Sequence, residues 1–229
     1  MMRELNMDEI KNAEKIESFD QVSAKLNKTE KEEIVIDEMD IVFLLDKSGS
    51  MFGIIDDTLG GFNSFIKREK EKEVKTRVTL VLFDHKYKVL YTRKPIEEVE
   101  ELTEEDYYAD GCTALLDAIG TTINRIEKEV CDEVLFVITT DGLENYSKEY
   151  SREDVKKLIR SHNWNFIFIG ADIDSYEEAA SLGIPSTRSA NYEKSRRGVG
   201  SLYRSVSYAK RLRSSGESLD KVNWKRGLD

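Results

Sequence analysis

The fold is decided by one short stretch of the chain, Met39-Asp40-Ile41-Val42-Phe43-Leu44-Leu45-Asp46. Almost every position from 39 to 45 is apolar, and this pattern is typical of a strand that is buried on both faces. Such strands lie at the centre of parallel sheets, because helices cover both faces of those sheets. The strand is expected to end at Asp46, since the next residues, Lys47-Ser48-Gly49-Ser50, are polar and include a glycine.

Helical and strand patterns alternate on the C-terminal side of this strand. Leu59, Phe62, Phe65 and Ile66, for example, recur at the three- and four-residue spacing of an amphipathic helix. The predicted helices span 54–73, 113–129, 152–161, 175–182 and 194–213, and the further predicted strands span 76–83, 87–92, 133–140 and 165–169, with a short one near Ser186. Alternation of this kind predicts βαβ units and a mostly parallel sheet.

One connection breaks the parallel pattern. The strands over 76–83 and 87–92 are separated only by Asp84-His85-Lys86, which predicts a hairpin. A hairpin places one antiparallel strand at the edge of a sheet that is otherwise parallel. The expected fold is therefore a Rossmann-like, doubly wound α/β fold, with a mostly parallel sheet, one antiparallel edge strand and helices on both faces.

The composition indicates a soluble globular protein with polar extensions, because 39% of the 229 residues are hydrophobic and 35% are charged. The formal net charge of −10 disfavours non-specific binding to nucleic acid. Cys112 and Cys131 lack the spacing of a disulfide framework or a metal site, and free thiols fit a reducing compartment. The N-terminus has no apolar signal core, and no apolar run reaches the roughly 20 residues of a membrane span. We therefore expect a cytoplasmic protein without membrane association.

Charge and pattern divide the chain into three parts. Residues 1–38 are an acidic helical extension, whose stripe over 8–33 fits a loosely packed leader and a partner-docking helix equally well. Residues 39–190 hold the predicted α/β domain. Residues 191–229 form a basic helix and tail, which we expect to pack on the acidic domain. The basic face of that helix consists of Arg196, Arg197, Arg204, Lys210, Arg211 and Arg213.

Polar side chains gather in three loops that follow strands or open helices. These loops are Asp46 to Met51, Asp110 to Leu115, and Thr139 to Gly142. In open α/β sheets, ligands bind in the crevice outside the carboxyl ends of the strands. The hydroxyl and carboxylate oxygens in these loops suit Mg²⁺, Mn²⁺ or Ca²⁺ and not zinc or copper. A simpler alternative is that the Ser, Thr and Asp side chains only cap helices.

Taken together, the three loops resemble a known site. The motif Asp46-x-Ser48-x-Ser50, Thr113 in a glycine-containing loop, and Asp141 with a glycine after an apolar strand resemble the metal-ion-dependent adhesion site (MIDAS) of von Willebrand factor A (VWA) domains. The resemblance covers roughly residues 39–190, in the order and loop contexts of that family. The segment also looks like the stand-alone bacterial and phage members of the family, although Cys112 stands where many relatives have glycine.

The resemblance implies a role for each residue. Ser48 and Ser50 would bind a divalent cation directly, Thr113 would bind it directly in the liganded state, and Asp46 and Asp141 would act largely through water. The cation would be Mg²⁺, or Mn²⁺ or Ca²⁺, and a carboxylate of a protein partner would complete its coordination. The expected rim around the partner consists of Met51, Cys112, Gly142, Glu144 and Asn145. The implied function is cation-dependent protein binding without enzymatic activity.

Other functions, two of them enzymatic, compete with this interpretation. A metal-dependent phosphoryl-transfer hydrolase would use Asp46 as its nucleophile, but enzymes resembling haloacid dehalogenases have a second Asp where Ser48 stands here. A serine hydrolase needs a base, and His85 and His162 both lie outside the strand-end loops. A nucleic-acid-linked scaffold would use the basic tail, which lacks the interleaved aromatic residues of single-strand binders.

Overall fold

Six strands form a single sheet in residues 36–228, the part of the chain that this computed structural model describes. The strands are β1 (Glu38–Asp46), β2 (Lys75–Phe83), β3 (Tyr87–Pro95), β4 (Val134–Thr140), β5 (Asn165–Gly170) and β6 (Ser189–Asn191). Their order is β3-β2-β1-β4-β5-β6, and only the β2–β3 pair is antiparallel. The predicted fold class is confirmed. The helical stripe predicted over 8–33, and with it nearly all of the 1–38 extension, lies outside the described residues.

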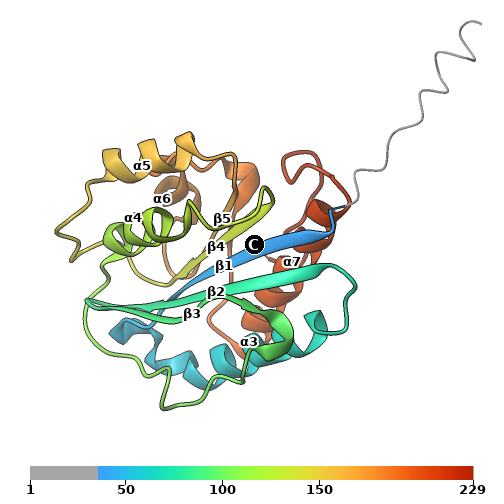
Figure 1. The fold of residues 1–229 in the computed structure, drawn as a ribbon. Coiled ribbons are helices and arrows are strands. Elements are labelled where there is room, and N and C mark those ends of the chain that lie inside the picture. The colour runs from blue at the N-terminus through green and yellow to red at the C-terminus, as the bar shows by residue number, and fades with distance from the viewer. Residues whose placement is uncertain (1–35, 229) are drawn as a thin grey trace, which may run out of the picture. The chain divides into compact units, whose positions relative to one another are not determined.

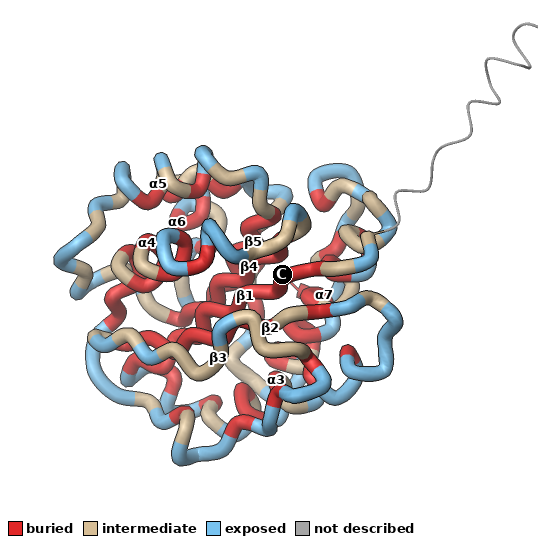
Figure 2. The backbone as a smooth tube through the Cα atoms, in the orientation of Figure 1, coloured by how far each residue is buried: buried red, intermediate tan, exposed pale blue. Residues whose placement is uncertain are grey.

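The first strand occupies the centre of the sheet, as its sequence predicts. It pairs with β2 on one side and β4 on the other, and all residues from Met39 to Asp46 are buried. Because side chains alternate along a strand, Phe43 and Leu45 enter one hydrophobic core and Val42 and Leu44 enter the other. Figure 2 shows the central strands as the most continuously buried part of the chain.

Helices cover both faces of the sheet (Figure 1). One core contains side chains of α3 (Ile55–Glu69) and α7 (Arg196–Ser214), and the other contains those of α4 (Leu115–Ile126), α5 (Arg152–Ser161) and α6 (Ser175–Ser181). The four apolar residues predicted to share a face of the helix over 54–73 all lie in the first core. Within residues 36–228, no helix is both long and apolar enough to cross a lipid bilayer.

Several element boundaries differ from those predicted. The helix predicted over 54–73 begins with a short 3₁₀ helix, Gly49–Ile54, and its α-helical part ends at Glu69. The last strand lies at Ser189–Asn191 instead of near Ser186, because a 3₁₀ turn, Ser186–Arg188, follows Pro185. The edge strand continues to Pro95, beyond the predicted end at 92, and its pairing with β2 contains a register shift.

Helix α7 and the residues after it are part of the folded unit. Lys210 forms a buried ion pair with Glu69 of α3 at 2.9 Å, and Arg213 donates two hydrogen bonds of 2.8 Å to Glu133. Beyond the helix, the Trp224 side chain is buried in the same core as the sheet. Two of the basic side chains of α7 are therefore neutralised by acidic side chains of the sheet-and-helix body.

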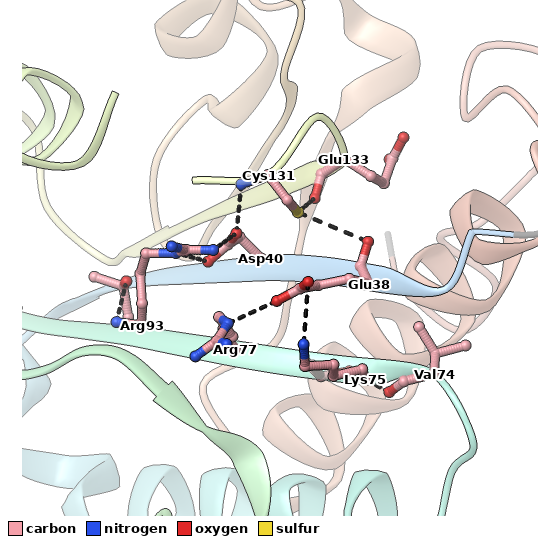
Figure 3. A network of polar contacts seen from close by, with 10 residues as sticks. Glu38, Asp40, Val74, Lys75, Arg77, Arg93, Cys131 and Glu133 are labelled. Carbon is pink, nitrogen blue, oxygen red and sulfur yellow. Dashed lines mark hydrogen bonds and ion pairs between the residues drawn. The ribbon is translucent and has the colours of Figure 1, made fainter. Parts of the chain in front are cut away.

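The amino-terminal end of β1 is held by a polar network (Figure 3). Arg93 donates two hydrogen bonds to Asp40, at 2.8 and 3.0 Å, and the Cys131 backbone N–H donates a third to the same carboxylate. Glu38 pairs with Arg77 and Lys75 on the neighbouring strand. Burial, together with the Asp40 carboxylate, raises the pKa of the Cys131 thiol to about 11. Ion pairs therefore occupy the amino-terminal end of the central strands, whereas the polar loops lie at the opposite, carboxyl-terminal end.

Two adjacent glycines of α3 test the close packing of α7. A Cβ atom on Gly61 would lie 2.6 Å from Tyr203 and 2.8 Å from Val199, whereas a Cβ on Gly60 would meet nothing within 4 Å. We expect Gly61→Ala to lower the free energy of unfolding by about 1–3 kcal/mol through overpacking. Gly60→Ala should raise it by about 0.5–1 kcal/mol, because alanine favours a helix interior. Urea denaturation of both variants measures this, and a Gly61→Ala protein as stable as Gly60→Ala would contradict the packing described.

Candidate metal centre

The three polar loops meet at the carboxyl edge of the sheet. The chain leaves β1 towards β2 on one side, while β4 lies on the other, so the strand order reverses between β1 and β4, which is where ligands bind in open α/β sheets. Backbone hydrogen bonds join the first two loops, from Gly49 N to Gly111 O at 3.1 Å and from Asp110 N to Lys47 O at 2.9 Å. The segment that follows the third loop joins the second through a hydrogen bond from Asn145 N to Thr113 O.

The hydroxyl groups predicted from the sequence converge at this edge. Ser48 Oγ lies 3.2 Å from Ser50 Oγ, and Ser50 Oγ donates a hydrogen bond of 2.5 Å to Asp141 Oδ1. Thr113 approaches the same place, because a Cβ atom built on Gly142 would lie 3.1 Å from Thr113 Oγ1 and 3.8 Å from Ser50 Oγ. Because Gly142 has no side chain, the space between Ser50 of the first loop and Thr113 of the second loop stays free.

Asp46 lies beneath these hydroxyls and is completely buried. Its Oδ1 accepts a hydrogen bond of 2.7 Å from the Ser48 backbone N–H, and its Oδ2 accepts one from the Thr140 hydroxyl. The Tyr107 hydroxyl donates to the backbone carbonyl of Asp46 at 2.6 Å. Thr140 belongs to the third loop, so the sequence already places it at this edge, whereas nothing in the sequence singles out Tyr107.

Two carboxylates therefore lie close together at this edge. Burial raises the pKa of the Asp46 carboxyl to about 6, hydrogen bonds from Thr140 and Ser48 oppose that rise, and the negative charge of Asp141 adds to it. A carboxylate in this position is stabilised by a cation bound nearby.

The donors present fit a hard divalent cation. No three His, Cys, Asp or Glu side chains within residues 36–228 are grouped to hold a metal, so a cation at this edge would depend on the hydroxyls as well. Serine, threonine and aspartate oxygens are the donors that Mg²⁺, Mn²⁺ and Ca²⁺ prefer. The space that Gly142 keeps free lies between Ser50 and Thr113.

Comparison with known proteins now gives the family. The model of the von Willebrand factor type A domain matches residues 40–201, which is more than half of the chain. The chain belongs to the von Willebrand factor type A domain family. No curated protein matches this VWA domain by sequence.

Solved structures share its fold. Proximal thread matrix protein 1 from the mussel byssus is 19% identical, with a TM-score of 0.53 over 75% of this chain and 46% of that chain. The PilB minor pilin from Streptococcus sanguinis is 11% identical, with a TM-score of 0.58 over 80% and 63%. The ArnB paralog VWA2 from Sulfolobus acidocaldarius is 18% identical, with a TM-score of 0.52 over 75% and 45%. The chain spans less than two thirds of each of these proteins.

A buried ion pair supports the first two loops of this VWA domain. Lys47, which stands between the motif residues, is buried and pairs with the Asp84 carboxylate in the β2–β3 turn. The Asp84 carbonyl accepts a hydrogen bond of 2.9 Å from Ala114 N at the start of α4. The neighbouring His85 ring lies against Gly111, whose φ of 72° and lack of a side chain allow this approach. The hairpin turn therefore supports the second loop.

The five residues expected to form the partner rim have different positions. Cys112 and Asn145 are exposed, and Gly142 and Glu144 are partly exposed. Met51 does not belong to the surface, because its side chain is 3% exposed and enters the core. The 3₁₀ geometry of Gly49–Ile54 turns Phe52 outward instead, with 75% of it exposed.

Two of the rim residues organise their own loop. Glu144 accepts hydrogen bonds from Leu116 N at the start of α4 and from the backbone N–H groups of Tyr146 and Ser147. Asn145 Oδ1 accepts a hydrogen bond of 2.9 Å from Thr113 N. The sequence predicts both side chains at the partner rim, and their hydrogen bonds show that they also shape the loop.

A positively charged side chain, that of Lys194, also reaches this edge of the sheet. Lys194, located between β6 and α7, places its Nζ 2.7 Å from Asp141 Oδ2 and 3.3 Å from Asp172 Oδ2. No local pattern in the sequence marks Lys194, which lies far from the motif along the chain. Asp172, in contrast, follows a strand end, and the structure places it at the rim of this site.

The pKa of Asp46 predicts how stabilisation by Mg²⁺ depends on pH. Because the folded-state pKa, about 6, lies above the ordinary 3.8, the stability that this group contributes to the metal-free fold is present below about pH 4 and is lost as the pH rises through 6. A bound cation favours the ionised form. Saturating Mg²⁺ should therefore raise the melting temperature more at about pH 7.5 than at about pH 5. Asp46→Asn is the control, and equal increments in the wild-type protein at both pH values would contradict the prediction.

Proposed function

We propose that this VWA domain is a divalent-cation-dependent protein-binding module that engages an acidic residue of a partner. The observation that carries the proposal is the convergence of Ser48, Ser50 and Thr113 hydroxyls beside Asp141, at the edge where ligands bind in open α/β sheets. Ser50 is exposed, so a ligand can reach the site from solvent.

The charges of the donors support a carboxylate as the ligand. Ser48, Ser50 and Thr113 would hold Mg²⁺, or Mn²⁺ or Ca²⁺, through neutral oxygens, while Asp46 and Asp141 would act mostly through water. Neutral direct ligands leave much of the positive charge of the ion unshared. Magnesium also keeps several water ligands in protein sites, and an incoming carboxylate can replace one of them. An Asp or Glu side chain of a partner brings a negative charge to the ion and can take the place of one water ligand.

The surface around the site supports a protein as the partner. The large hydrophobic side chains that are exposed within residues 36–228 are Phe52, Tyr108, Leu143 and Tyr146. Phe52 and Leu143 directly follow two of the loops that form the site, Tyr108 lies two residues before the other, and Tyr146 lies three residues after Leu143. Exposed apolar groups gathered on one face mark interaction surfaces, and aromatic residues are enriched there. We call these four residues the apolar rim.

The competing functions have weaker support. A phosphoryl-transfer hydrolase needs an accessible nucleophile, but Asp46 is completely buried and both of its carboxylate oxygens accept hydrogen bonds. A nucleic-acid-linked scaffold needs free cationic groups on α7, and two of these, Lys210 and Arg213, are engaged in ion pairs with acidic side chains.

Metal binding tests the site itself. Calorimetric titration with Mg²⁺ and Mn²⁺ should show one bound ion, with the affinity lowered at least about tenfold in Ser48→Ala and in Thr113→Ala, because each variant removes one direct oxygen ligand. Ser64→Ala, an exposed serine of α3 away from the site, is the matched control and should bind normally. Titration curves that are the same for all four proteins would refute the assigned site.

The apolar rim tests partner binding. A protein captured from a lysate in Mg²⁺ and released by EDTA should no longer be captured by Phe52→Ser or Leu143→Ser, because central apolar anchors supply much of the binding energy of an interface. Lys72→Ser changes an exposed residue of the turn that follows α3 and should leave capture intact. If both rim variants captured the same protein as efficiently as wild type, the apolar rim would not be the docking surface.

A further inference from the structure

Lys194 connects the segment before α7 to the metal edge. Its Nζ lies 2.7 Å from Asp141 Oδ2, 3.3 Å from Asp172 Oδ2, and 3.0 Å from the backbone carbonyl of Ser50, to which it donates a hydrogen bond. Two of these three partners, Asp141 and Ser50, are residues of the proposed site. The side chain is 23% exposed, so the ammonium group is partly shielded from water.

The contacts show that Lys194 occupies a position of strong negative potential. Asp141 uses Oδ1 to accept the Ser50 hydroxyl hydrogen bond and Oδ2 for the ion pair with Lys194, so both of its oxygens are engaged. Burial disfavours the charged ammonium, but the interactions with Asp141 and Asp172 outweigh this and raise the pKa of Lys194. The group therefore stays a cation.

We propose that the Lys194 ammonium is a tethered cation that competes with the divalent ion for Asp141, and that it thereby sets the metal affinity of the site. The inference rests on the proposed function, because it assumes that the edge binds a divalent ion. A positive charge held 2.7 Å from Asp141 neutralises that carboxylate and repels a second cation arriving at Ser50 and Asp141. Lys194 must leave Asp141 before the ion binds with full strength.

Asp172 provides the place to which Lys194 can withdraw. Its carboxylate already lies within 3.3 Å of Nζ, and 69% of its side chain is exposed, so it sits on the solvent side of the ammonium. Its φ of 54° is unusual for a residue other than glycine and holds it in this turn. A lysine side chain has enough rotatable bonds to keep the Asp172 contact while it releases Asp141.

The exchange has a consequence for selectivity. A monovalent ion brings no more charge than the ammonium that it would displace, and it lacks the tether that keeps Lys194 at high local concentration. A divalent ion interacts with Asp141 and Asp46 through twice the charge. Lys194 would thus keep the site closed to monovalent ions and raise the divalent-ion concentration needed for occupancy.

Calorimetric titration of the full chain with Mg²⁺ and Mn²⁺ tests the inference. Lys194→Met keeps an unbranched apolar side chain and removes the charge, and it should bind both ions at least about tenfold more tightly than wild type. Arg197→Met removes an exposed positive charge three residues further along the chain that makes none of these contacts, and its affinity should stay within about twofold of wild type. Equal affinities of Lys194→Met and wild type would overturn the role of Lys194 while leaving the metal site intact.

A second measurement uses the wild-type chain and does not depend on how the variant folds. Acylation of lysines by an N-hydroxysuccinimide ester, read by mass spectrometry, should modify Lys194 several-fold faster when Mg²⁺ is bound, whereas exposed Lys72 should react at an unchanged rate. Unchanged protection of Lys194 in saturating Mg²⁺ would contradict the exchange. If neither wild type nor Lys194→Met bound Mg²⁺ or Mn²⁺, the proposed function would fail and this inference with it.

Discussion

The carboxylate of Asp46, buried at the end of the central strand, is the constraint on which the functional edge depends. It accepts hydrogen bonds from Ser48 N in the first loop and from the Thr140 hydroxyl at the end of β4, 94 residues away along the chain. Tyr107, which donates to the Asp46 carbonyl, adds the segment that leads into the second loop. Burying a charge is unfavourable unless hydrogen bonds and counter-charges compensate it. The three loops are therefore held together around the Asp46 carboxylate, whose negative charge a cation bound nearby would stabilise.

Much of this arrangement follows from local sequence patterns. The continuous apolar run of β1 predicts that this strand is buried on both faces. The positions of Ser48, Thr113 and Asp141 follow because the carboxyl ends of parallel strands meet at one edge of the sheet. The structure brings all five predicted metal-site residues to that edge. Their role as metal ligands remains a proposal, which the geometry and the chemistry of the donors support.

The features that the sequence did not predict depend on tertiary contacts. Lys194 and Tyr107 reach the site from segments whose local patterns carry no sign of it. Met51, predicted at the partner rim, enters the core, and Phe52 is exposed instead, in a segment that forms a 3₁₀ helix. Helix α3 ends at Glu69 although the charged residues up to Glu73 favour a helix: Glu69 is buried against Lys210, whereas residues 70–73 are exposed.

The central claim is that a divalent cation binds between the hydroxyls of the three loops, and an anomalous diffraction experiment on crystals grown with Mn²⁺ tests it most directly. The account predicts one strong anomalous peak within direct coordination distance, about 2.0–2.3 Å, of Ser48 Oγ and Ser50 Oγ. Asp46 and Asp141 would lie just beyond it, and Lys194 would have withdrawn from Asp141. A peak elsewhere, for example at the acidic residues Asp56 and Asp57 of α3, or no peak at saturating Mn²⁺, would contradict the account.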